Sequence, residues 1–420
     1  MTNGLYCTIL LKLGMFSKLE RVCNSNQLCV IISKIHRGET DKITLDALED
    51  VFDSLKSSLR MQILSKLTQA APYKALGLIH RHDLDTLQAY FCRLYFEPET
   101  VTSQSIEKKL RSACNYPRSC FNLYNYFMHF DEARAFGMLD TYFIAVGLQQ
   151  LAKVDCRKPL YIDNVCINTR KMSVKNGQKV SIVMTAYNES ELIVPATRSL
   201  MEQTYKNIEI IFVDDASSDD TVKLFTELCR QESFTSYKVI SIKQRSGPFV
   251  TRNIGIKHAA GEYITFHDAD DWSHPERLQE QMKKNADKQV VASISQLVRI
   301  KPNGQFFAKN IYPIKRVSMV SLMIKRDVFC DLGYFYTDVI GADSEYFERI
   351  KIFYGMKRIG VVKKVLTFAA HRKNSQTTSA DIGTPEFGIN PKRVAHWEIF
   401  RERQSEMVEG KRSFFVPFES

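Results

Sequence analysis

The spacing of apolar residues changes about 170 residues into the chain. Before that point apolar residues recur every three or four positions, as in residues 44–64, 84–94 and 130–151, with short polar or proline-containing breaks between them. This period is typical of amphipathic helices, so we expect an all-α domain over residues 1–173. Because no repeat length is fixed, a packed helical domain is preferred to a repeat solenoid.

After a polar connector at residues 174–179, short apolar runs alternate with helical patterns. Residues 180–186, 208–215 and 237–242 have the length of strands, and helical patterns end near residue 203 and cover residues 221–231 and 250–260. This alternation predicts an α/β domain with a mostly parallel sheet over residues 174–390. Residues 391–420 form a C-terminal tail that we expect to pack on one of the two domains.

Polar side chains follow the predicted strands where each strand ends. Asn188 follows the first strand, Asp214 and Asp215 end the second, and Asp268 and Asp270 follow a later apolar run. In an open parallel sheet, ligands bind beyond the carboxyl ends of the strands. The sequence therefore predicts a polar ligand site at this edge of the sheet.

Three carboxylates, Asp268, Asp270 and Asp271, lie within four residues. Their mutual repulsion destabilises a fold unless positive charge lies among them, and a divalent cation is the simplest source of that charge. The alternative is a solvated acidic turn in which an aspartate caps the next helix, whose first turn we expect to carry Pro275 and Glu276.

Composition narrows the class of protein. The chain has 420 residues, is 44% hydrophobic and carries a formal charge of +11, which suits anionic partners, but it has no recognisable nucleic-acid-binding module. Its ten cysteines form no C-x-x-C pair and have no histidine at zinc-ligand spacing, so we expect reduced thiols. With neither a signal peptide nor a long apolar segment, the sequence predicts a cytoplasmic protein, soluble or attached to the inner face of a membrane.

Five motifs in order carry a resemblance to a known family: residues 180–188, residues 211–219, Gly247 with residues 251–255, residues 260–271, and residues 341–345. Together they resemble the family 2 glycosyltransferases of GT-A fold, which are inverting enzymes that use nucleotide-sugar donors. The resemblance covers roughly residues 178–380 and leaves the helical half unassigned.

The resemblance implies a role for each matching residue. The nucleotide site would be lined by Thr185, Tyr187 and Asn188, with one carboxylate of Asp214 and Asp215 on the base or ribose and Arg252 on the nucleotide or its phosphates. Asp268 and Asp270 would form the family's D-x-D element, with Asp270 on Mn²⁺ or Mg²⁺ and Asp268 supporting the donor. His371 is a further candidate metal ligand or phosphate contact at the end of a basic segment.

An inverting displacement also requires a base that removes the proton of the acceptor hydroxyl. Asp343 fits this position in the last motif, and Glu345 is the second candidate, because Ala342 departs from the commoner Glu-Asp form. The alternative for this motif is a helix start capped by Asp343.

The resemblance thus implies transfer of a sugar, most simply from a UDP-sugar, to a glycan or lipid-linked acceptor in bacterial capsule, lipopolysaccharide or exopolysaccharide synthesis. The absence of a Q-x-x-R-W signature argues against a processive synthase. The helical domain would either bind a partner, such as another polysaccharide-assembly protein, or support the neighbouring domain. Two alternatives stay open: a nucleotidyltransferase, although its glycine-rich loop is missing after the first strand, and a non-catalytic nucleotide-binding or signalling module.

Overall fold

The computed structural model describes residues 15–22, 27–55, 57–101, 105, 116–167, 173–309, 311–338, 340–373, 375, 378–379, 381–385 and 388–418. The chain divides into two compact units. A helical unit comprises residues 1–142, 306–314 and 372–406, and a sheet unit comprises residues 143–305, 315–371 and 407–420.

These units do not follow the boundaries that the sequence predicts at residues 174 and 391. Residues after 142 join the sheet unit, where the Gln149 backbone amide donates to Glu276 Oε2 at 2.9 Å and Phe143 stacks on His274 at 5.5 Å. Residues 306–314 join the helical unit, where the Asn125 side chain exchanges two hydrogen bonds of 2.7 Å with the Phe306 backbone. Local periodicity carries no information about such returns of the chain.

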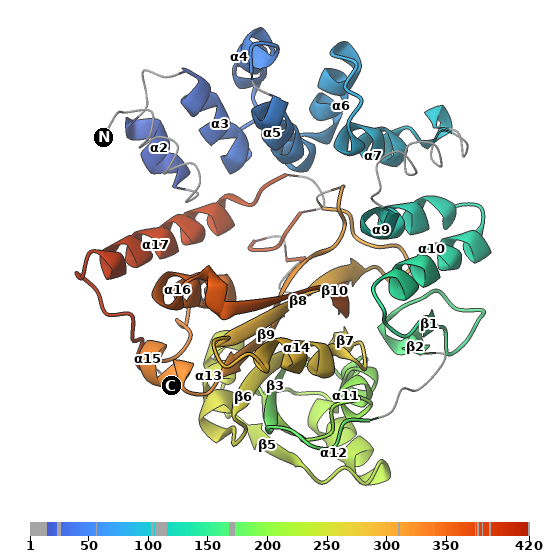
Figure 1. Ribbon diagram of the computed structural model, residues 1–420, viewed down its shortest axis with the longest axis vertical. Coiled ribbons are helices and arrows are strands. Elements are labelled where there is room, and N and C mark those ends of the chain that lie inside the picture. Colours follow the sequence, from blue (N-terminus) through green and yellow to red (C-terminus); the bar gives the residue numbers. More distant parts are fainter. Residues whose placement is uncertain are drawn as a thin grey trace. The chain divides into compact units, whose positions relative to one another are not determined.

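The helical unit consists of short amphipathic helices. Their bounds in the described residues are α2 (Phe16–Val22), α3 (Gln27–Arg37), α4 (Lys42–Phe52), α5 (Ser57–Ala70), α6 (Pro72–Arg81), α7 (Leu87–Phe96), α9 (Tyr116–Phe127), α10 (Glu132–Ala145) and α17 (Pro391–Val408), with a 3₁₀ turn η1 (Pro98–Thr100). Helices α2 to α7 follow one another in a row in Figure 1, with α3 against α4 and α5, and α5 against α6 and α7. The predicted helix over residues 44–64 is two helices, α4 and α5.

The prediction that residues 151–167 belong to an all-α domain is wrong. They form two short antiparallel strands, β1 (Leu151–Ala152) and β2 (Cys166–Ile167), around a 3₁₀ turn η2 (Ile162–Asn164). The turn is held by the buried Asn164, whose side chain donates to the carbonyl groups of Asp155, Lys158 and Pro159. A single buried asparagine that joins three carbonyls leaves no periodic signal in the sequence.

In its described residues, the sheet unit contains one eight-stranded sheet in the order β5-β4-β3-β6-β9-β8-β10-β7. The first four strands in that order run parallel, and β9 lies antiparallel between β6 and β8. The strands are β3 (Val180–Ala186), β4 (Ile208–Asp214), β5 (Tyr237–Ser241), β6 (Tyr263–Asp268), β7 (Trp272–Ser273), β8 (Ala292–Ile300), β9 (Arg316–Lys325) and β10 (Ile359–Ala370).

Helices cover both faces of this sheet (Figure 1). They are α11 (Ile193–Met201), α12 (Thr221–Gln231), α13 (Pro248–His258), α14 (Arg277–Asn285), α15 (Val328–Leu332) and α16 (Ala342–Tyr354), followed by a 3₁₀ turn η3 (Met356–Arg358). Residues Met184 and Phe212 face α11 and α12, and Phe212 stacks on Phe225 at 4.2 Å. On the other face α13 lies so close to β3 that a Cβ on Gly255 would be 2.3 Å from Val183 Cγ1.

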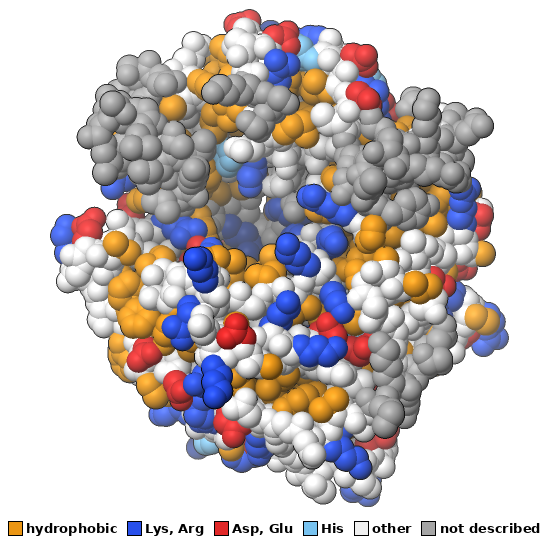
Figure 2. Space-filling view, viewed as in Figure 1, with side chains coloured by type: hydrophobic (Ala, Val, Ile, Leu, Met, Phe, Trp, Pro, Cys, Tyr) orange, Lys and Arg blue, Asp and Glu red, His pale blue; other side chains and the backbone are white. Residues whose placement is uncertain are grey.

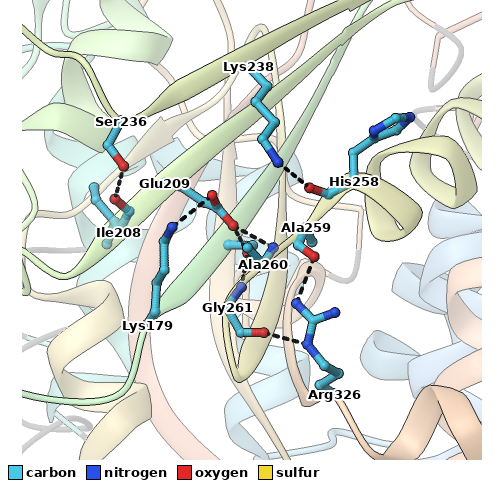
Figure 3. Close-up of polar contacts among 11 residues, drawn as sticks. Lys179, Ile208, Glu209, Ser236, Lys238, His258, Ala259, Ala260, Gly261 and Arg326 are labelled. Atoms are coloured by element: carbon cyan, nitrogen blue, oxygen red, sulfur yellow. Dashed lines mark hydrogen bonds and ion pairs between the residues drawn. The ribbon is translucent and has the colours of Figure 1, made fainter.

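At the amino edge of the sheet, the buried Glu209 joins β3, β4 and the turn before β6 (Figure 3). Its carboxylate accepts hydrogen bonds from Lys179 Nζ at 2.9 Å, Ser181 Oγ at 2.5 Å and the Ala260 amide at 2.6 Å. Burial alone raises the pKa of Glu209, but these partners outweigh burial and lower it below its ordinary value. Glu209 is therefore a fully satisfied structural carboxylate.

The expected fold class, an α/β domain with a mostly parallel sheet preceded by helices, is confirmed. Strand β3 and helix α12 have the predicted bounds, and β4 ends one residue before the predicted end. None of the helices in the described residues combines the length and the apolar character that a bilayer span requires.

Candidate active site

The carboxyl ends of three adjacent strands bring together the polar residues that the sequence singles out. In the register of the sheet, Thr185 of β3 pairs with Val213 of β4 on one side and with Asp268 of β6 on the other, and Ala186 pairs with Asp214. Because neighbouring strands lie about 4.8 Å apart, Asp214 and Asp268 are separated by about 10 Å. They end strands on the same edge, opposite the edge that carries Glu209.

The two acidic residues at the end of β4 differ in what they bind. Asp215 is buried, and its two oxygens accept the backbone amides of Ser246 at 2.7 Å and Gly247 at 2.9 Å. Asp214 is also buried; one oxygen accepts the Ser217 amide at 3.2 Å, and Oδ1 has no hydrogen-bond partner among the described residues. A buried carboxylate oxygen without a partner is costly, so Asp214 is the member of the pair that is ready to accept a ligand donor.

Asn188 ties the loop after β3 to the loop after β4. Its φ of 53° lies in the left-handed region, its amide donates to Ser217 Oγ at 2.9 Å, and its Oδ1 accepts the Ser218 amide at 2.8 Å. Asparagine tolerates this conformation better than most residues. Asn188 therefore shapes the rim of the site, and the neighbouring Tyr187 is left with 36% of its surface exposed.

Arg252 of α13 links the acidic triplet to the motif at residues 341–345. Its guanidinium is buried and donates to Asp268 Oδ1 at 2.7 Å. Burial alone lowers the pKa of Arg252, but the negative charges of Asp268, Asp343 and Asp271 outweigh it and raise the pKa above its ordinary value. The charge of Asp343, which lies 75 positions beyond Asp268 in the sequence, thus acts on the same guanidinium as Asp268.

Asp271 is buried and lies beside the end of β10. Its Oδ1 accepts the Ala370 amide at 3.1 Å, and Arg299 Nη1 donates to the Ala370 carbonyl at 3.1 Å. Burial, followed by the charges of Asp270 and Asp268, raises the pKa of Asp271 well above its ordinary value, although Arg299 opposes the shift. The idea that Asp271 caps the next helix is wrong, because α14 begins at Arg277 with Glu276 as its N-cap.

Arginine side chains supply part of the positive charge that the sequence argument assigns to a cation. Besides Arg252 and Arg299, the fully buried Arg277 donates to Ser273 Oγ at 2.7 Å. Burial lowers the pKa of Arg277 to about 10, and Asp271 partly opposes this effect. The electrostatic case for a metal ion therefore rests on the geometry of Asp268 and Asp270 and no longer on the number of acids.

The surroundings of Asp268, Asp270 and His371 show how these residues would fit a metal ion. Among the described residues, no group of three or more His, Cys, Asp or Glu side chains is arranged to hold a metal ion, so Asp268, Asp270 and His371 do not form a closed coordination set. Asp268 nevertheless accepts the Arg252 hydrogen bond through Oδ1 alone, and 34% of its side chain is exposed. Two neighbouring carboxylates at an open edge suit an ion whose other ligands come from the substrate and water. His371 follows Ala370 directly, and its amide donates to the Ile300 carbonyl at 2.8 Å.

Asp343 and Glu345 lie in the first turn of α16 but in different environments. Gly341, with a φ of 73°, is the N-cap, so Asp343 is not the cap residue. Asp343 is half-buried and accepts the Ser344 amide at 2.7 Å. Glu345 is fully buried and forms an ion pair of 3.1 Å with the equally buried Arg349. These surroundings favour Asp343 as the acid that faces a ligand.

Replacing Glu345 by alanine is expected to lower stability because Arg349 would remain charged and buried. Breaking a buried ion pair in this way costs about 3–5 kcal/mol. Thermal and urea unfolding of Glu345→Ala would measure the loss. The matched control is Glu348→Ala on the same helix, whose partly exposed pair with Lys351 is expected to contribute less than about 1 kcal/mol. Equal stability of the two variants would contradict the structural role of Glu345.

Three arginines near the site were missed by sequence reasoning. Arg277 is buried and Arg299 half-buried beside the triplet, and Arg245 stacks on Tyr187 with its Cζ 4.0 Å from the ring centroid. A signal existed for Arg299, because it is a charged residue inside the apolar run 292–300. For Arg245 the only signal was its position just before Ser246 and Gly247, where a helix begins.

Comparison with known proteins finds similarity over the sheet unit. Residues 181–339 match the family described as Glycosyl transferase family 2. An uncharacterized glycosyltransferase of Rickettsia conorii is 32% identical over 154 residues, which cover 35% of this chain and 25% of that protein. The amylovoran biosynthesis glycosyltransferase AmsB of Erwinia amylovora is 35% identical over 146 residues, 33% of this chain and 46% of that protein.

Residues 181–339 are thus similar to the glycosyl transferase family 2, and the chain spans about a quarter of the length of the Rickettsia relative. Among solved structures, S. aureus TarS residues 1–349 in complex with UDP-GlcNAc has a TM-score of 0.40 and 22% identity, covering 48% of this chain and 61% of that one.

Proposed function

We propose that this chain is an inverting, metal-dependent glycosyltransferase. It transfers a sugar from a nucleotide-sugar, in the first instance a UDP-sugar, to a hydroxyl of a glycan or lipid-linked acceptor. The observation that carries the proposal is the hydrogen bond of 2.7 Å from the buried Arg252 to Asp268 at the end of β6, on the same sheet edge as the unpartnered oxygen of Asp214. The charge of Asp343 at the start of α16 also acts on Arg252, which supports Asp343 as the base of the same site.

Each residue has a defined task in this proposal. Asp214 accepts a hydrogen bond from the nucleoside through its unpartnered Oδ1, while Asn188 and Asp215 hold the loops that surround it. A divalent ion held by Asp270 and Asp268 would neutralise negative charge on the departing nucleoside diphosphate. Asp343 removes the proton of the acceptor hydroxyl, whose oxygen attacks the anomeric carbon as the bond to the diphosphate breaks. Glu345 has no part in this step, because it is paired with Arg349.

The kind of acceptor is proposed from the relatives. AmsB is named for the biosynthesis of amylovoran, which supports a role for this chain in bacterial surface polysaccharide synthesis.

The distribution of charge gives no separate support for nucleic acid as a partner. Figure 2 shows Lys and Arg side chains with Asp and Glu among them near α14, where Glu280 pairs with both Lys283 and Lys364. These basic residues are already compensated by a carboxylate.

The proposal is tested by incubating the full chain with UDP- and GDP-sugars and an alcohol acceptor, with Mn²⁺, Mg²⁺ or EDTA. The expected result is release of nucleoside diphosphate that requires the metal ion, with a product of inverted anomeric configuration by NMR. Nucleoside diphosphate alone, at 100 times its dissociation constant, is expected to stabilise the protein by about 2.7 kcal/mol. Transfer with retained configuration, or full activity in EDTA, would contradict the proposed mechanism.

A further inference from the structure

A guanidinium group stacks on the aromatic ring at the rim of the site. Arg245 Cζ lies 4.0 Å from the centroid of the half-exposed ring of Tyr187. Tyr187 follows β3, whereas Arg245 lies in the segment between β5 and α13. A cation over an exposed ring contributes only about 0.5–1 kcal/mol. The contact therefore contributes little to stability, but it places the guanidinium over the ring at the rim of the site.

The backbone next to Arg245 is anchored at the end of β4. The Ser246 and Gly247 amides donate to the two oxygens of Asp215 at 2.7 and 2.9 Å, and Gly247 adopts a φ of 89° as the N-cap of α13. Asp215 follows Asp214 directly, and Asp214 carries the buried oxygen that lacks a partner. The segment that carries Arg245 is consequently held beside the end of β4, because two consecutive backbone amides of this segment donate to the two oxygens of one carboxylate.

The guanidinium is held in position while its hydrogen-bond donors remain unused. Arg245 is exposed and makes no hydrogen bond or ion pair with any other residue that the structure describes, whereas Arg252 in the same unit is bound to Asp268. A planar guanidinium that lies over a ring keeps its N–H groups in its own plane, where they point away from its central carbon. Such an arrangement is suited to donate to carbonyl, hydroxyl or ring-nitrogen acceptors of a ligand.

The strand order separates the two ends of a bound nucleotide-sugar. From the outer edge the order is β5, β4, β3 and β6, and the segment with Arg245 returns from the end of β5 to Asp215 at the end of β4 and to Tyr187 after β3. With a diphosphate near Asp268 and Asp270, beyond β6, the nucleoside of the proposed donor would extend toward β3 and β4, where Asp214 has its unpartnered oxygen. Arg245 lies on the nucleoside side of the site.

We propose that Arg245 is a donor-specificity residue, which binds the nucleoside of the nucleotide-sugar through the guanidinium that Tyr187 orients. This inference rests on the proposed function, because it assumes a nucleotide-sugar donor. It adds a residue that acts on donor affinity without taking part in the transfer step.

The test compares three variants of the full chain in UDP binding by calorimetry and in donor kinetics. Arg245→Ala is expected to weaken UDP binding and raise the donor KM by about 10-fold, with kcat changed less than about threefold. Arg245→Lys keeps the charge but loses the planar fork, and is expected to resemble Arg245→Ala. The matched control is Lys243→Ala, which removes one exposed positive charge from the same segment and is expected to stay within about twofold of the wild type.

A second probe separates recognition of the nucleoside from attraction of phosphate. Inorganic pyrophosphate with Mn²⁺ is expected to bind Arg245→Ala as well as it binds the wild type. An equal loss of UDP and pyrophosphate affinity, or wild-type behaviour of Arg245→Lys, would reduce Arg245 to a source of charge and overturn the inference, as would unchanged UDP binding in Arg245→Ala. A wild-type protein that binds neither UDP nor GDP would instead overturn the proposed function.

Discussion

Replacing Asp343 by asparagine is expected to lower kcat by about 10³-fold while the donor dissociation constant stays within about threefold of the wild type. Asparagine preserves the shape of the side chain and the acceptor for the Ser344 amide, which Asp343 Oδ1 accepts at 2.7 Å. The substitution removes the basic oxygen and leaves the helix start intact, because Gly341 is the N-cap. Steady-state transfer assays and calorimetric titration with UDP measure the two quantities.

Two further variants decide whether the loss in Asp343→Asn reflects the base. Asp343→Glu keeps a carboxylate one methylene further out and is expected to recover part of the lost activity. Glu348→Gln alters a carboxylate on the same helix that pairs with Lys351, and is expected to keep kcat within about twofold. If Asp343→Asn loses donor binding and thermal stability together, the acid holds the structure and does not act as a base.

The strands and helices near the site were predictable because their signals are local. Residues 180–186 and 208–215 have the apolar pattern and the length of strands, and they correspond to β3 and, but for the last residue, to β4. The rule that parallel strands bind ligands at their carboxyl ends then brings Asp214 and Asp268 to one edge without any knowledge of the rest of the chain. The sheet register confirms that they share this edge.

The division of labour between adjacent acids was not predictable. Asp214 and Asp215 are equivalent in the sequence, yet Asp215 is occupied by the amides of Ser246 and Gly247, about 30 residues later. Asp343 and Glu345 are likewise two residues apart. The i, i+4 spacing of Glu345 and Arg349 is visible in the sequence, but only the fold shows that both side chains of this pair are fully buried. Each distinction depends on partners or burial that tertiary packing supplies, and periodicity does not encode them.

The charge argument for the acidic triplet was incomplete for the same reason. Three carboxylates within four residues suggest a cation when the neighbouring sequence is considered alone. In the fold, Arg252 approaches Asp268 from α13, and Arg299 and Arg277 lie near Asp271 from β8 and α14. The three acids thus have different surroundings, and their substitution is expected to give different results.

Asp270→Asn is expected to reduce metal-dependent transfer by about 10³-fold, because charge stabilisation by a bound ion supplies several kcal/mol in the transition state. Mn²⁺ titration in the presence of UDP, followed by calorimetry, is expected to show the parallel loss of metal affinity. Asparagine keeps the volume and polarity of the side chain, so folding is expected to be unchanged. The matched control is Asp220→Asn, which removes an exposed carboxylate from the same edge of the sheet, where it makes no side-chain cap bond to α12.

Comparison with Asp268→Asn and Asp271→Asn assigns the remaining roles within the triplet. Asp268→Asn is expected to weaken metal binding and also to release Arg252, whose main ionic partner it removes. Asp271→Asn retains an oxygen that accepts the Ala370 amide, so the end of β10 stays in place and most of the metal affinity is expected to remain. A metal affinity that is lost equally in all three variants would mean that the triplet acts as one diffuse negative charge, whereas loss centred on Asp270 identifies the side chain that faces the ion.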